Sequence, residues 1–150
     1  PLEDLVEMYY NSVGHNTTLI LGVTPNQEGL IPEPDAKRLR EFGKEIERRF
    51  SNPIASTSGK GDLINLELPE MQTVNQVVIM EDIAQGERVR EFILEGKTTD
   101  GWQNIFEGSC IGHKFIHRFD AVDVSELRLK ILKSKGEPQI KELTVYDIEN

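Results

Sequence analysis

The sequence has few of the features that mark several large classes of protein. It has a single cysteine, Cys110, in 150 residues, so an intrachain disulfide is excluded and the redox compartment cannot be inferred. No apolar run approaches the roughly 20 residues of a membrane-spanning helix. There is no internal repeat, no low-complexity tract and no recognisable signal peptide. Because the chain opens on Pro1 rather than on methionine, we expect it to have lost its natural N-terminus.

Basic residues are also scarce relative to acidic ones. There are 17 lysines and arginines against 26 aspartates and glutamates, which gives a net charge of −9. This balance argues against nucleic acid or an anionic membrane as a partner, because both would be repelled. Neutral ligands such as sugars remain compatible with it. A hydrophobic fraction of 37% and a charged fraction of 29% are typical of a folded globular protein.

The first third of the chain predicts the order helix, strand, helix. Apolar residues of 2–10 recur at helical spacing, and Pro34 suits the first turn of a second helix over 34–50. Between them, 17–23 mixes β-branched residues and leucines without alternation, which is typical of a strand buried on both faces, and the turn formers of 24–29 end it. The last unit of a closed β/α barrel has this order. One such strand cannot form a parallel sheet, so we expect the chain to be part of a larger fold.

The rest of the chain predicts a different architecture. Residues 51–62 are rich in serine, glycine and asparagine without any period, and we interpret them as a linker. Beyond them the hydrophobic period changes to two. Strands are expected at 64–68, 74–80, 89–95, 102–106, 109–119, 126–132 and 140–148. Several short strands separated by turn residues predict an antiparallel β-sandwich.

The histidines do not form a convincing metal site. His113 and His117 fall on one face of the predicted strand 109–119. Four residues of extended strand span roughly 13 Å, which is too far for one ion. We therefore interpret both as half-buried or rim side chains, and His15 stands alone in a connector.

Two other reactive or aromatic side chains have competing interpretations. Cys110 has no histidine on its face and no redox motif, which favours a small buried or surface thiol. Trp102 follows an Asp-Gly turn and could stack on a sugar ring, although a position in the sandwich core is favoured.

The acidic residues contain no recognisable catalytic pair of carboxylates. Three of them are expected on the solvated side of the second helix: Glu41, Glu45 and Glu47. The residues of this chain therefore do not supply a complete catalytic site.

Residues 5–50 carry motifs that are similar to those of one known family. These motifs are SVGHN before the strand, the leucine-rich strand itself, the turn Pro25 to Ile31, and a helix with Leu39, Phe42 and Gly43. Together they resemble the C-terminal end of the catalytic barrel of family 29 α-L-fucosidases. That family more often has arginine in place of His15 and asparagine in place of Gly22.

Residues 63–148 resemble a second unit, the discoidin-like or galactose-binding-like β-sandwich often appended to bacterial fucosidases. The segments EDIAQGERVREFILEG, DGWQNIFEG and IGHKFIHRF carry this resemblance, in which Trp102 and Arg128 correspond to core positions. A complete module normally begins with more sequence, including a loop that often binds calcium. Here SGKGD leads directly into INLEL, so calcium is possible but unsupported by this sequence. No other cofactor or metal is expected.

The resemblance implies hydrolysis of terminal α-L-fucosyl linkages with retention of configuration. Such enzymes use an aspartate nucleophile and a second carboxylic acid about 5 Å apart. Both would lie upstream of Pro1, so we expect this chain alone to be inactive. Active sites of β/α barrels lie at the C-terminal ends of the strands. The substrate-side candidates are therefore Thr24, Asn26 and Gln27, with a plain structural turn as the alternative for each.

The predicted organisation is a barrel end over 1–50, a linker over 51–62 and a discoidin-like β-sandwich over 63–150. The expected partners are fucosylated glycans and the remainder of the catalytic barrel. Two alternatives remain for the sandwich, a carbohydrate-binding module or a protein-interaction domain without catalysis. The resemblance to bacterial fucosidases also implies a periplasmic or secreted location.

Overall fold

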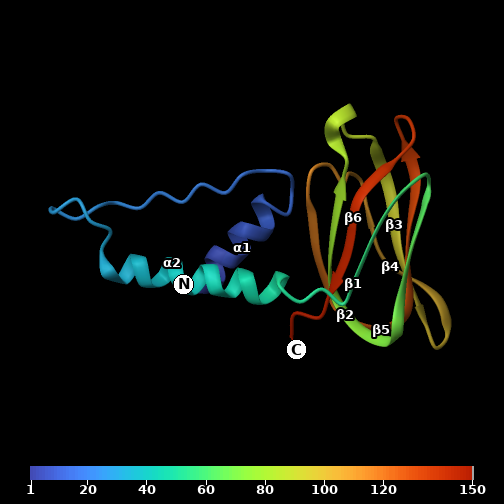
Figure 1. Ribbon diagram of the computed structural model, residues 1–150, viewed down its shortest axis with the longest axis horizontal. Coiled ribbons are helices and arrows are strands. Elements are labelled where there is room, and N and C mark those ends of the chain that lie inside the picture. Colours follow the sequence, from blue (N-terminus) through green and yellow to red (C-terminus); the bar gives the residue numbers. More distant parts are fainter. Residues whose placement is uncertain (150) are drawn as a thin grey trace.

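The computed structural model describes residues 1–149 and contains a helical segment beside an all-antiparallel sheet (Figure 1). The helices are α1 (Leu2–Ser12), α2 (Glu33–Phe50) and a short 3-10 helix, η1 (Ile83–Gln85). The strands are β1 (Ala55–Lys60), β2 (Leu63–Glu81), β3 (Val89–Thr98), β4 (Gly101–Gly108), β5 (Phe115–Ser134) and β6 (Gln139–Tyr146). No helix within 1–149 is long and apolar enough to cross a membrane.

Both predicted helices are confirmed, and their ends follow local chemistry. In α1 the acids Glu3 and Asp4 occupy the first turn, where the positive end of the helix dipole favours them. In α2 a proline sits in the first turn, and Arg48 and Arg49 occupy the last turn near the negative end. The 18 residues of α2 correspond to a length of about 27 Å at 1.5 Å per residue.

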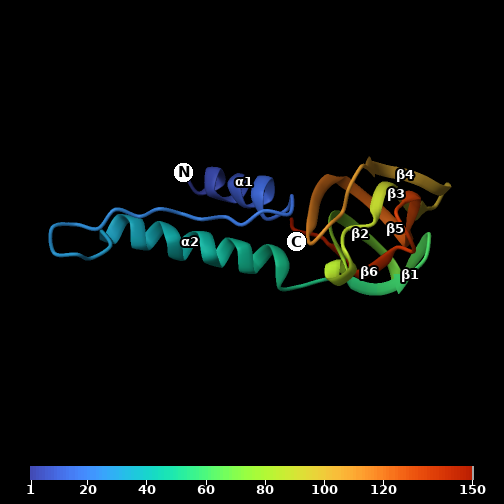
Figure 2. The same cartoon turned by 90° about the horizontal axis from the view of Figure 1, so that it is seen from above.

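The sheet has the strand order β1-β6-β2-β5-β3-β4, and every pairing is antiparallel. It curls so that β4 and β1 lie on opposite sides of the sandwich (Figure 2). The register between β2 and β5 breaks between Glu67 and Gln72, where Pro69 cannot donate to the ladder. The predicted antiparallel β-sandwich is therefore confirmed, although 64–68 and 74–80 belong to one long strand, β2.

Two apolar clusters hold the structure together. The larger fills the inside of the curled sheet and includes the fully buried Phe92, Leu94 and Leu129. The smaller lies on the outer face of the sheet, where the helices pack against it. Its buried members are Val6, Tyr10, Val78, Ile116 and Tyr146. The helices therefore pack against the sheet through a hydrophobic interface and are not connected to it by the chain alone.

The predicted strand 17–23 does not form in this chain. Residues 17–32, called the arm below, run extended between α1 and α2 (Figure 1), and 18–25 make no backbone hydrogen bond within residues 1–149. The side chain of Ile20 is 85% exposed. A parallel strand needs neighbours to satisfy its backbone groups, and the described part of the chain supplies none beside it.

Two other predictions from the sequence are corrected. The predicted linker 51–62 contains β1, because Ala55 and Thr57 pair with strand β6 and add an edge to the sheet. The predicted strand 109–119 begins only at Phe115. Before it, Gly112 has a φ of +70° and turns the chain, so 109–114 is a loop.

Candidate functional site

The three candidate substrate-side residues lie at the end of the arm farthest from the sandwich. The side-chain oxygen of Asn26 accepts hydrogen bonds from the backbone nitrogens of Glu28 and Leu30, both at 2.9 Å, so it closes the turn. Thr24 and Gln27 are exposed. A substrate role for all three stays a prediction, and the use of the Asn26 amide within its own turn fits the structural alternative.

A concavity of about 310 Å³ lies beside this turn, bounded by α1, the arm and α2. It is lined by Leu5, Leu21, Gly22, Val23, Thr24, Asp35, Arg38 and Leu39. Asp35 is the one carboxylate among these lining residues. Retaining glycosidases need two carboxyl groups about 5 Å apart, so this concavity does not amount to a catalytic site.

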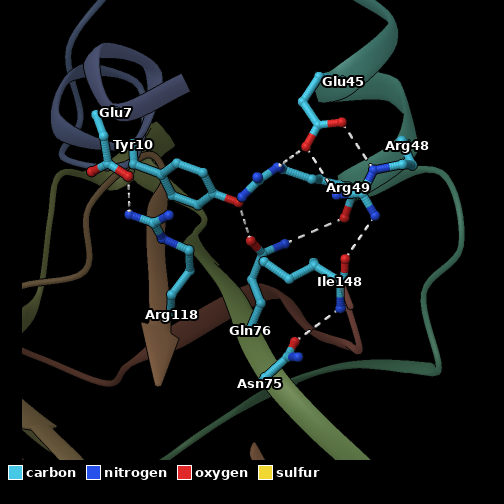
Figure 3. A network of polar contacts seen from close by, with 9 residues as sticks. All are labelled: Glu7, Tyr10, Glu45, Arg48, Arg49, Asn75, Gln76, Arg118 and Ile148. Atoms are coloured by element: carbon cyan, nitrogen blue, oxygen red, sulfur yellow. Dashed lines mark hydrogen bonds and ion pairs between the residues drawn. The ribbon is translucent and has the colours of Figure 1, made fainter. Parts of the chain in front are cut away.

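The most elaborate polar arrangement is the contact between the helices and the sandwich, shown in Figure 3. Tyr10 of α1 is buried at its centre, and its hydroxyl donates to the side-chain oxygen of the fully buried Gln76 on β2. The Gln76 amide nitrogen in turn donates to the backbone oxygen of Arg49 at 3.4 Å. Gln76 therefore binds both helices to the sheet, and a buried side chain of this kind is stable only when such partners are present.

Charged side chains surround this contact. Glu45 of α2 accepts two hydrogen bonds from Arg48, both at 2.9 Å, and one from Arg49 at 2.7 Å. Hydrogen bonding from Arg48, with further contributions from Arg49, lowers the pKa of the Glu45 carboxyl from 4.5 to about 2. Arg48 also donates to the backbone oxygen of Ile148 at 2.7 Å, which joins α2 to the end of the sandwich.

The histidines are distributed differently from the sequence prediction. His113 lies exposed in the loop 109–114 rather than on a strand, and the exposed His15 has its ring edge against Phe115. His117 is half-buried, with its ring 4.3 Å from that of Phe106. Burial lowers the pKa of His117 below 6.5, and nearby His15 and Arg118 lower it further. No group of three or more potential metal ligands occurs within residues 1–149.

Trp102 is partly buried and lies outside the apolar core cluster of the sandwich. The guanidinium of Arg128 lies 4.0 Å from the centroid of the indole ring, and Arg128 also donates to Glu95. One face of the tryptophan is therefore covered by a cation, which leaves less of the ring for stacking on a sugar. Cys110 is an exposed free thiol, as one of the two interpretations predicted.

Sequence reasoning missed the residues that join the helices to the sandwich. It placed Glu45 on the solvated side of its helix, whereas the structure leaves this side chain 21% exposed within an ion-pair cluster. Tyr10 and Gln76 are 66 residues apart, so no local pattern links them. The one available signal was SVGHN, the motif that carries the family resemblance and that lies directly against the sandwich.

Comparisons with known proteins match nearly the whole chain. The α-L-fucosidase 1 of Arabidopsis thaliana is 31% identical over 183 residues, which cover 97% of this chain and 36% of the plant protein. That stretch is longer than the 150 residues here, so the plant protein has additional residues inside the matched region. No family model matches the chain.

Solved structures give the same result. The crystal structure of a candidate α-L-fucosidase from Bacteroides thetaiotaomicron is 45% identical and superposes with a TM-score of 0.95 over 98% of this chain and 34% of its own. A family 29 fucosidase of Ruminococcus gnavus in complex with fucose is 25% identical, with a TM-score of 0.84 over 97% of this chain and 36% of its own. The chain thus spans about a third of the length of the relatives that it matches.

The fold and the comparisons together show that this chain is similar to one region of glycoside hydrolases of family 29, namely a helical segment joined to a β-sandwich. More particularly, it is similar to about a third of each α-L-fucosidase that it matches, in agreement with the resemblance carried by the motifs of residues 5–50 and 63–148.

Proposed function

We propose that this chain forms the last β/α unit and the appended β-sandwich of a retaining α-L-fucosidase. The whole protein would release terminal α-L-fucose from glycans, while this chain alone would be inactive. The observation that carries the proposal is the arm. Its leucine-rich residues 19–23 lie extended between two helices, without a backbone hydrogen-bond partner among residues 1–149 and with Ile20 85% exposed, as expected for a barrel strand whose neighbours belong to the rest of the protein.

The apolar side chains of the arm support the same proposal. Leu30 is 60% exposed and Ile31 is 51% exposed, while α1 contributes Met8 at 48%. Exposed apolar side chains gathered on one segment mark a surface that is covered by another part of the protein. The partner that we propose is the remainder of the catalytic barrel, in which the two strands neighbouring 17–23 would pair with it and satisfy its backbone groups.

In this arrangement the turn 24–30 lies at the C-terminal end of the last strand, where the active site of a β/α barrel is found. Thr24 and Gln27 would then face the catalytic centre, and Asn26 would shape the turn through its two backbone contacts. The nucleophile and the acid would come from the other part of the protein. We also propose a periplasmic or secreted location, which rests on the sequence resemblance alone.

The decisive experiment is to express the longer protein that includes the residues upstream of Pro1. We expect this longer protein to hydrolyse an aryl α-L-fucoside, and the anomer first observed by NMR to be the α form, because two displacements retain the configuration. The 150-residue chain is the matched control and should show no turnover. Turnover by the chain alone, or an upstream region without barrel-length sequence, would contradict the proposal.

A further inference from the structure

A second contact between the helical segment and the sandwich lies at Asn16, directly before the arm. Asn16 has a φ of +67° and is the one non-glycine residue with a positive φ among residues 1–149. Its side chain donates to the backbone oxygen of Ile111 at 2.9 Å and accepts from the backbone nitrogen of Lys114 at 2.7 Å. Its own backbone nitrogen donates to the oxygen of Lys114 at 3.2 Å. One residue in an unusual conformation thus binds the loop 109–114 at three points.

The loop that receives Asn16 is fixed from its other side. The buried carboxylate of Glu81 accepts a hydrogen bond from the backbone nitrogen of Gly112 at 2.7 Å. Gly112 has a φ of +70°, and a Cβ atom on it would lie 2.7 Å from the side-chain amide of Asn16, so a larger residue would strain the backbone and displace Asn16. The backbone nitrogen of Ile116 also donates to the oxygen of Gly14 at 3.1 Å. The joint, as we call the contact between 14–16 and 111–116, is therefore a closely fitted one.

The direction of the arm separates the joint from the proposed catalytic face. From Asn16 the arm runs away from the sandwich, and both views place the turn 24–30 at the opposite end of the helical segment (Figures 1 and 2). Helix α2, about 27 Å long, returns over this distance to the sandwich. In a β/α barrel, the face at the N-terminal ends of the strands contributes stability and the other face carries catalysis.

We propose that the sandwich braces the N-terminal face of the barrel, remote from the reacting sugar, and that Asn16 is the positioning residue of this brace. The inference rests on the proposed fucosidase function for the identity of the two faces, but the joint itself does not depend on it. Together with the Tyr10–Gln76 contact, the joint holds the sandwich at two points. The sandwich is thereby a fixed part of the enzyme rather than a module on a flexible tether, and it does not line the catalytic centre.

The test uses the longer protein, freed of other reactive cysteines by changes that include Cys110→Ser. Spin labels are attached after Lys44→Cys on α2 and Lys133→Cys on β5, two exposed positions on either side of the joint. Distances between the labels are measured in the parent protein and in the double variant Asn16→Ala/Tyr10→Phe. The matched control is Asn104→Ala/Tyr9→Phe, since Asn104 lies on β4 and its side chain donates to Glu107 away from the joint.

We expect the double variant to broaden the distance distribution, and hydrogen exchange at the Lys114 amide to accelerate at least about tenfold because its acceptor is lost. Asn16→Asp, which keeps that acceptor, should restore slow exchange at Lys114. Asn16→Gly, which tolerates the positive φ but lacks the side chain, should not. The kcat/KM for an aryl α-L-fucoside should stay within about twofold of the parent value in the double variant.

Unchanged distances in the double variant would overturn the brace. So would a tenfold or larger rise in KM for a fucosyl substrate in the double variant, since this would place the joint near the catalytic centre. If the unmodified longer protein hydrolyses no fucoside, the proposed function fails, but the distances and the exchange rates still decide whether the joint holds.

Discussion

The guanidinium of Arg118, on β5, lies over the ring of Tyr10, on α1, 4.1 Å from its centroid. Arg118 also forms an ion pair with Glu7 of the same helix at 2.6 Å. The tyrosine is thus held by the sheet through its ring face and through its hydroxyl. This double contact makes α1 part of the sandwich interface, although the helix precedes the first strand by more than 40 residues.

Tyr10→Phe should lower the free energy of unfolding by about 1–3 kcal/mol, because the side-chain oxygen of the fully buried Gln76 loses its donor. Equilibrium unfolding in urea measures the change. Tyr9→Phe, on the neighbouring and more exposed tyrosine, is the control and should cost less than about 0.5 kcal/mol. Equal decreases in the free energy of unfolding in the two variants would show that the Tyr10–Gln76 contact does not stabilise the packing of the helices against the sandwich.

Glu45→Gln should lower the free energy of unfolding by roughly 1–2 kcal/mol at neutral pH, because the carboxylate binds two arginines. The folded-state pKa of Glu45 is lowered to about 2, so its contribution is present above pH 4.5 and is lost as the pH falls from 4.5 toward 2. Unfolding measured across this range should show a shallower acid dependence in the variant. Glu41→Gln, whose carboxylate forms longer contacts with Lys37 and Arg38, is the control and should leave the profile close to the parent.

The half-buried His117 should make the protein less stable below about pH 6.5. Burial lowers its folded-state pKa, so the unfolded chain binds more protons between that value and 6.5, and the free energy of unfolding falls as the pH falls through this window. His117→Gln should flatten the profile in this window, whereas the same change at the exposed His113 should not. A profile that His117→Gln leaves unaltered would contradict the prediction.

Glu81→Gln should loosen two loops at once. One carboxylate oxygen accepts from the backbone nitrogens of Arg88 and Val89, both at 2.9 Å, and the other accepts from Gly112. The amide side chain has one acceptor oxygen, so at least one of these donors loses its partner, at a cost of about 1.5–3 kcal/mol. Hydrogen exchange at these amides should accelerate. Glu87→Gln, on the adjacent exposed loop, is the control and should leave these exchange rates unchanged. Unaltered exchange protection in Glu81→Gln would contradict the proposed role of the Glu81 carboxylate.

The sequence by itself determined the parts of the molecule that depend on short-range patterns. Helical spacing and a proline in the first turn are sufficient for α1 and α2, since helix hydrogen bonds close within four residues. Alternating apolar residues likewise located most of β2, β3, β5 and β6, because one face of each strand is buried. The family motifs around SVGHN predicted a larger fold, but they did not show what each residue contacts.

Tertiary structure decided everything that depends on distant partners. The residues 55–60 form a strand because β6, roughly 80 residues later, offers them an edge, while the better strand sequence 17–23 has no neighbouring strand within residues 1–149. Asn16 and Ile111 are 95 residues apart, and Tyr10 and Gln76 are 66 apart. Backbone groups and buried amides are satisfied by whatever the fold brings beside them. The sequence therefore specified the helices and most of the strands, and the tertiary structure determined which residues they contact.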